Sequence, residues 1–254
     1  MRAIGLLVVL ALGGSVCRAQ DDALWEARKE LTAAKENVEK VVTFCRHCKA
    51  SGRLEEKECG WCDGLGVMLK CEEKMVEHRH ELQLKAERLG GKREDYARYD
   101  LANWLEKLQR DIAPETLKLL PEYVAYLKTY RKYEETIRQD ERFAADAALL
   151  KERLEALIER HGRRVTQTCM QWLYDEQPAG KVGAFNLYGK VKDVRIDGRQ
   201  AGLFELRTLK GQPVLLLTDQ ARQWPGFVVG EIVGPGTYRT DDGEEIRGVL
   251  IRAY

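Results

Sequence analysis

Residues 45–66 read CRHCKASGRLEEKECGWCDGLG and contain two Cys-x-x-Cys pairs, each followed by small residues. A Cys-x-x-Cys turn directs two sulfurs at one point, and two such turns complete a closed tetrahedral zinc site. Because this stretch, which we call the cysteine segment, has almost no apolar core, metal binding would supply the free energy that folds it. The spacing therefore predicts one structural zinc ion held by Cys45, Cys48, Cys59 and Cys62.

Two other uses of these cysteines stay open at this point. In an oxidising compartment, cysteines so close together tend to form disulfides, and a Cys-x-x-Cys pair can also be a redox-active dithiol. No thioredoxin-like strand–helix–strand pattern surrounds the pairs, which disfavours redox work. The glycines that follow each pair suit a zinc turn, whereas disulfides would not require them.

The second repeat, residues 59–66 (CGWCDGLG), is a complete C-x-x-C-x-G-x-G motif. The first, residues 45–52 (CRHCKASG), departs from it only at Ala50, where the motif has glycine. The cysteine segment thus resembles the cysteine-rich zinc domain of DnaJ-type chaperones, although that family has four repeats and two zinc sites. The resemblance implies half of that domain, a zinc-held β-hairpin with the four cysteines as ligands. The chain has no His-Pro-Asp tripeptide, so the resemblance implies no cochaperone activity.

Residues 1–19 have the features of a secretory signal peptide: Arg2, an apolar run over residues 3–12, and small residues before a cleavage point after Ala19. The apolar run is too short for a membrane span, which needs about 20 residues. Cys17 would be the modified residue of a lipoprotein, but Val16 before it is not small. We therefore expect an extracytoplasmic protein, periplasmic or secreted.

Residues 20–162 carry helical patterns, and they predict an antiparallel, coiled-coil-like hairpin or small bundle with the cysteine segment at its first turn. Gly90-Gly91 predicts a break, Pro114 the first turn of a new helix, and Pro121 a restart or a kink. Two seams have heptad spacing: Tyr123, Tyr126, Tyr130, Tyr133 and Ile137, then Phe143, Ala147, Leu150, Leu154 and Leu157. We interpret the tyrosines as packing between helices, with a ligand platform as the alternative.

After a linker or capping segment over residues 163–180, the composition becomes rich in glycine and β-branched residues. Turn signals divide residues 181–254 into five expected strands, at 182–197, 202–209, 213–218, 227–239 and 246–253. A long first strand with Gly189 near its middle resembles that of an OB-fold, the five-stranded Greek-key barrel. An SH3-like barrel is the alternative. The chain as a whole is therefore expected to be a multidomain α+β protein, and no single family resemblance covers it.

The net charge and the absence of known catalytic motifs limit the classes of function that fit the sequence. The net charge of +1 gives no sign of a nucleic-acid partner, and no hydrolase, metalloprotease, phosphate-loop or dinucleotide motif is present. We therefore expect a non-catalytic exported binding or scaffold protein with an unidentified protein or peptide partner, and a homodimer through the helical seams is an option. A chaperone-like holdase of the cell envelope and a thiol–disulfide redox protein are the alternatives. Whether Cys71 and Cys169 form a bridge stays open.

Overall fold

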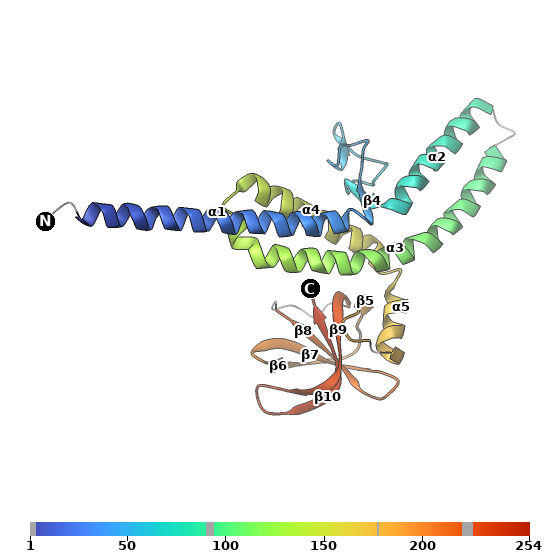
Figure 1. Ribbon diagram of the computed structural model, residues 1–254. Helices are drawn as coiled ribbons and strands as arrows, with labels where there is room; N and C mark the ends of the chain where they lie inside the picture. Colours follow the sequence, from blue (N-terminus) through green and yellow to red (C-terminus); the bar gives the residue numbers. More distant parts are fainter. Residues whose placement is uncertain (1–3, 90–93, 177, 220–225) are drawn as a thin grey trace.

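The computed structural model describes residues 4–89, 94–176, 178–219 and 226–254. A helical part is followed by a sheet domain, and the cysteine segment projects from the helical part (Figure 1). The helical elements are α1 (Ile4–Val38), α2 (Lys70–Leu89), α3 (Glu94–Ile137), α4 (Glu141–Gly162), α5 (Thr166–Gln171) and the π-helical η2 (Trp172–Glu176). Four short strands flank or lie in the cysteine segment: β1 (Val42–Phe44), β2 (Arg53–Leu54), β3 (Lys57–Glu58) and β4 (Val67–Leu69).

Helix α3 is the centre of the helical part, because both α1 and α4 pack along it (Figure 1). The predicted seam of α1 is buried there: Leu31 is 3% exposed, and Val38 is fully buried. The sequence pattern predicts a helix from Asp21 to about Phe44, but α1 ends at Val38, because residues 42–44 pair as β1 with β4. Asp21 and Asp22 are of a residue type that favours a helix start, but they begin no helix here, since α1 already runs from Ile4. None of the described helices is long and apolar enough to cross a membrane.

The tyrosine seam packs helices together, as expected. Tyr123, Tyr126 and Tyr133 are each less than a tenth exposed. The hydroxyl of Tyr126 donates a hydrogen bond of 2.9 Å to the carbonyl of Ala147 on α4, and that of Tyr133 donates one of 2.8 Å to Glu30 on α1. These rings therefore join α3 to both neighbouring helices within one chain.

The two prolines do not divide α3. We expected a new helix at Pro114, but Pro114 and Pro121 both lie inside one helix of 44 residues. Each proline removes one backbone hydrogen bond, and burial of the neighbouring side chains, such as Leu119 and Leu120, favours continuation of the helix. Figure 1 shows that α3 bends between its arm beside α2 and its stretch along α1. The expected break at Gly90-Gly91 lies outside the described residues.

The C-terminal part is a six-stranded sheet in the order β5-β9-β10-β8-β7-β6. Its strands are β5 (Val182–Asn186), β6 (Val191–Ile196), β7 (Arg199–Arg207), β8 (Pro213–Thr218), β9 (Phe227–Arg239) and β10 (Glu245–Ala253). All pairings are antiparallel except that of β8 with β10. The predicted bounds of β8 and β9 are confirmed.

Two details of the predicted sheet need correction. The expected single strand over 182–197 is two strands, because the backbone turns between them and Gly189 adopts a φ of +98°. Strands β5 and β6 form the two ends of the sheet and do not pair with each other, so the sheet is not closed and a barrel is not shown.

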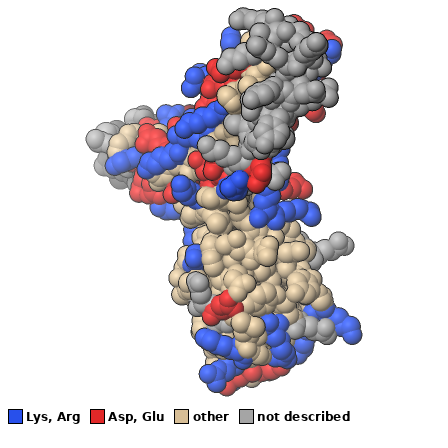
Figure 2. Space-filling view, turned by 90° about the vertical axis from the view of Figure 1, so that its right-hand side faces the viewer, with Lys and Arg blue, Asp and Glu red and all other residues tan. Residues whose placement is uncertain are grey.

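Alternate residues of the central strand β8 enter two different cores, as the pleat of a strand requires. Val214 and Leu216 belong to the core that the sheet shares with the helices, whereas Leu215 and Leu217 belong to a second core formed within the sheet. Within residues 163–180, which we expected to be a linker or capping segment, α5 packs on β5. Figure 2 shows that charged side chains crowd the helical part and the lower end of the sheet domain, with few between them.

Candidate metal centre

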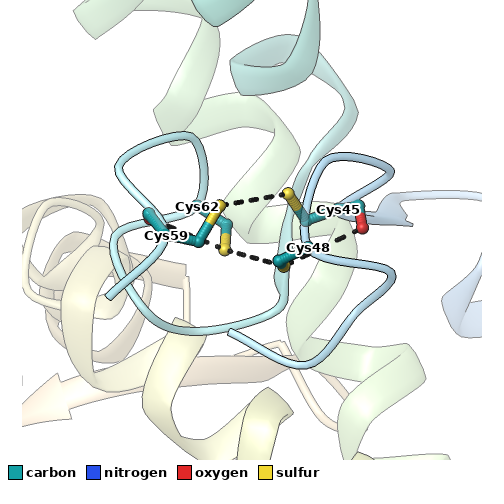
Figure 3. A group of neighbouring side chains, drawn as sticks. All are labelled: Cys45, Cys48, Cys59 and Cys62. Atoms are coloured by element: carbon teal, nitrogen blue, oxygen red, sulfur yellow. Dashed lines mark hydrogen bonds between the residues drawn. The ribbon is translucent and has the colours of Figure 1, made fainter. Parts of the chain in front are cut away.

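The four cysteines of the cysteine segment come together in the structure. Cys45 and Cys48 follow β1, and Cys59 and Cys62 lie between β3 and β4. Their sulfurs all lie within 4.8 Å of one another, and each residue is at most 5% exposed. Two Sγ–Sγ contacts join the two pairs: 3.8 Å for Cys45–Cys59 and 3.7 Å for Cys48–Cys62. Figure 3 shows the side chains pointing toward one another, so they could hold a metal ion such as zinc.

Backbone amides point at the sulfurs in the same way in both repeats. The N–H of Gly52 donates to Sγ of Cys48 at 3.3 Å, and the N–H of Gly66 donates to Sγ of Cys62 at 3.1 Å. In each case the donor is the last glycine of the repeat. Hydrogen bonds to a sulfur favour its thiolate form, which is the form that binds a metal.

These last glycines are required because the two repeats touch through their backbones. A Cβ on Gly52 would lie 2.1 Å from the carbonyl oxygen of Gly64, and one on Gly66 would lie 2.3 Å from that of Ala50. Both glycines also have a positive φ, of +78° and +73°. The motif glycines thus allow the two Cys-x-x-Cys turns to approach until four sulfurs meet.

Ala50 is the one departure from the motif, and it carries backbone strain. Its φ is +63°, which L-residues avoid at a cost of about 1–2 kcal/mol. We predict that Ala50→Gly binds zinc several-fold more tightly, since relief of this strain should exceed the extra chain entropy that glycine loses on folding, about 0.4–1 kcal/mol. Competition with a coloured zinc chelator measures the change. Unchanged or weaker zinc binding would contradict the assignment of strain to Ala50.

The thiols differ in how readily they ionise. Burial raises the pKa of both Cys45 and Cys62. Burial acts in the same direction on Cys48, but hydrogen bonds from the Gly52 amide and the neighbouring thiols lower its pKa to about 7. Four adjacent thiolates need a compensating positive charge, which a divalent cation supplies. Metal binding should therefore release protons from this cluster.

The donor set fits zinc in a closed structural site. Four sulfurs in tetrahedral arrangement select zinc or an iron–sulfur centre, and four protein ligands leave no open position for a substrate. Among the residues that the structure describes, no second group of this kind occurs. His47, which lies inside the first Cys-x-x-Cys pair, stacks on the ring of Trp61 at 3.4 Å between centroids.

Several contacts fix the cysteine segment to the helices. The ring of Trp61 also contacts that of the exposed His80 on α2, with centroids 5.0 Å apart. Arg46 pairs with Glu73 on α2 at 3.4 Å, and Arg160 on α4 pairs with Asp63. The segment is thus held by both α2 and α4.

A buried pair beside the metal centre was not predicted from the sequence. Nε2 of His161, near the end of α4, lies 2.9 Å from Oε1 of Glu72 on α2, while Oε2 of Glu72 accepts a hydrogen bond from the amide of Leu69. Burial acts to raise the pKa of Glu72, but the contacts with His161 and Leu69 lower it overall. The two residues are 89 positions apart in the chain, so no local pattern could have indicated their contact.

Cys71 and Cys169 are separate thiols and form no disulfide. Burial raises the pKa of Cys71 to about 12, with the carboxylate of Glu115 adding to the effect. Burial also raises the pKa of Cys169 to about 11, although its sulfur accepts a hydrogen bond from the amide of Ala184. Both therefore stay protonated near neutral pH.

Comparison with known proteins adds no relative. No family model matches the chain, and neither a curated protein nor a solved structure matches it.

Proposed function

We propose that this chain is an exported, non-catalytic binding or scaffold protein in which one zinc ion fixes the cysteine segment against α2 and α4. The observation that carries the proposal is the closed cluster of four buried sulfurs. A site with four protein ligands supports structure rather than catalysis. The contacts of Asp63, Trp61 and Arg46 with the helices would pass that support to the helical part.

The proposal includes two resemblances, that of the cysteine segment to the DnaJ-type zinc domain and that of the sheet domain to the OB-fold. The shared N–H to sulfur geometry of the two repeats supports a DnaJ-like zinc hairpin. Two features of the sheet support an OB-like domain. Strands β8 and β10 pair in parallel. Strands β5 and β6 follow one another in the chain but lie at opposite ends of the sheet. In this interpretation the first strand of the OB-fold is split near Gly189.

The two alternative functions receive less support from the residues involved. A redox dithiol needs an accessible, low-pKa thiolate, whereas all four sulfurs of the cluster are buried. A holdase would need exposed apolar surface, whereas three of the four tyrosines of the α3 seam lie in the core. Scaffolding by a zinc-held segment requires neither feature.

One preparation tests export and zinc together. We predict that the full chain, expressed with its own N-terminus in a bacterial host, is recovered from the periplasm starting at Gln20 with one zinc per chain and no added metal. Six thiols should react after denaturation in a chelator, and five of them, the four of the cluster and the buried Cys169, should be protected beforehand. Mass spectrometry, metal analysis and thiol titration give the three readouts.

Each contrary result has a separate meaning. A metal-free protein with two disulfides among the four cysteines would refute the zinc site, and reduction of insulin disulfides would favour the redox alternative. Suppression of aggregation of a model substrate would favour the holdase. Recovery of an uncleaved chain in the cytoplasm would refute export.

A further inference from the structure

A cleft of about 740 Å³ lies between α3, α4 and the start of β9. We call it the α3–α4–β9 cleft. Its size is in the range of ligand sites, about 300–1,000 Å³. None of the four zinc-site cysteines lines it. It is therefore separate from the metal centre, and the proposed scaffold role does not account for it.

The floor of the cleft is apolar and its rim is aromatic. Ile158, Val228 and Val229 are buried at the floor. Tyr130 and Phe227 are only partly buried, so their rings are available to a ligand. A site with an apolar floor and a few convergent polar groups is typical for binding.

The charges in the cleft are partly engaged already. Glu134 pairs with Arg138 at 2.9 Å, and Glu155 pairs with Lys151 at 2.9 Å. Arg131 and Arg163 also line the cleft, and neither forms an ion pair with any residue the structure describes. Glu159, one helical turn before Arg163, is the remaining carboxylate without such a pair.

The walls of the cleft are held in place by contacts of their own. Glu231 on β9 accepts hydrogen bonds from Lys128 on α3 at 3.0 Å and from the Tyr254 hydroxyl at 2.8 Å. Gly162 lets Phe227 approach the end of α4, because a Cβ there would lie 2.7 Å from the ring. Arg163 lies over the same ring, 5.9 Å from its centroid. The cleft is therefore preformed, which lowers the entropic cost of binding.

We propose that the α3–α4–β9 cleft binds an acidic peptide segment of a partner protein. Arg131 and Arg163 would pair with its carboxylates, since a guanidinium matches a carboxylate in two parallel hydrogen bonds. Tyr130 and Phe227 would contact its apolar side chains. The many polar groups of the lining suit a peptide backbone better than a lipid. This inference rests on the proposed function and names the class of its partner.

Two fluorescein-labelled peptide pools test the proposal on the zinc-loaded mature chain. Both are random sequences of Phe, Leu, Gly and Ser, one with added Asp and Glu and the other with added Lys and Arg. Fluorescence anisotropy should show binding of the acidic pool. The double variant Arg131→Gln/Arg163→Gln should lower its affinity at least tenfold, while Arg164→Gln, at the exposed residue next to Arg163, should leave it unchanged.

Three results would overturn the proposal: no binding of the acidic pool at millimolar concentration, tighter binding of the basic pool, or equal affinity of the double variant and the parent. Circular dichroism and zinc content of the variants establish that they are folded. Because every sample is checked for one zinc per chain, a failure of peptide binding leaves the zinc scaffold intact. Loss of zinc from the parent itself would instead count against the proposed function.

Discussion

Replacing Gly66 by alanine should abolish stoichiometric zinc binding. Gly66 has a φ of +73°, and an added Cβ would lie 2.3 Å from the carbonyl oxygen of Ala50 and 3.2 Å from the amide of Gly52. Both neighbours are backbone atoms of the other repeat, so they can yield only if the two Cys-x-x-Cys turns separate. The amide of Gly66 would then also lose its hydrogen bond to the sulfur of Cys62. We expect apo protein with a disordered cysteine segment.

Gly64→Ala is the matched control, since it changes a glycine in the same repeat. Its φ is +80°, so alanine there meets the same kind of backbone strain. The nearest atoms to its Cβ, however, belong to the flexible Glu58 side chain at 3.5 Å. We therefore expect Gly64→Ala to keep its zinc and to lose about 1–2 kcal/mol of stability.

Metal analysis after dialysis against a weak chelator separates the two variants. One zinc should remain with Gly64→Ala and none with Gly66→Ala. If both variants lose zinc, the positive φ alone decides binding. If both keep it, the backbone contact between the repeats is not required. Either result would contradict the geometry on which the metal centre is built.

The same contrast shows why the site was largely predictable from sequence. The spacing of the four cysteines and the glycines after them lies within residues 45–66, and local turns place the sulfurs. The contact of Gly52 with Gly64, and of Gly66 with Ala50, joins the two repeats in space. The motif contains these glycines, but their reason becomes visible only in three dimensions.

The sequence predicts an element correctly where local signals set both of its ends. Strands β8 and β9 begin and end at the expected residues, since turn signals bound their apolar runs. The prolines of α3 were misread because local propensity disfavours them, while packing against α1 and α4 keeps the helix continuous. The split of the first strand into β5 and β6 depends on which neighbours each half pairs with, β9 and β7 respectively. No local pattern carries that information.

The contact of His161 with Glu72 is the clearest feature that sequence missed, and it leads to the second prediction. His161 is 3% exposed and the Glu72 side chain 16%. The pair joins the end of α4 to the start of α2, directly after β4. Because the pKa of Glu72 in the folded chain lies below its ordinary value of 4.5, its ionised form stabilises the fold above that pH. The contribution is lost as the pH falls through the lowered pKa.

We expect Glu72→Gln to lower the free energy of unfolding by about 2 kcal/mol at pH 7, because it removes a carboxylate charge 2.9 Å from Nε2 of the buried His161. Glutamine keeps the shape of the Glu72 side chain and an acceptor for the Leu69 amide. The loss of stability therefore measures the contribution of the carboxylate charge beside His161. Glu73→Gln is the control. Glu73 pairs at 3.4 Å with Arg46, whose side chain is 78% exposed, and such surface pairs contribute about 0–1 kcal/mol.

Urea unfolding of the zinc-loaded protein measures both variants, and a double-mutant cycle with His161→Gln isolates the pair. A coupling energy of about 0.5–3 kcal/mol between Glu72 and His161 would confirm the contact, as residues in direct contact couple by this amount. Equal losses in Glu72→Gln and Glu73→Gln, with no coupling to His161, would show that the pair contributes nothing specific. The contact between Arg160 and Asp63 would then be the main link between α4 and this part of the chain. With coupling present, the end of α4 is joined to the start of α2 by a contact of its own, in addition to the contact of Arg160 with Asp63.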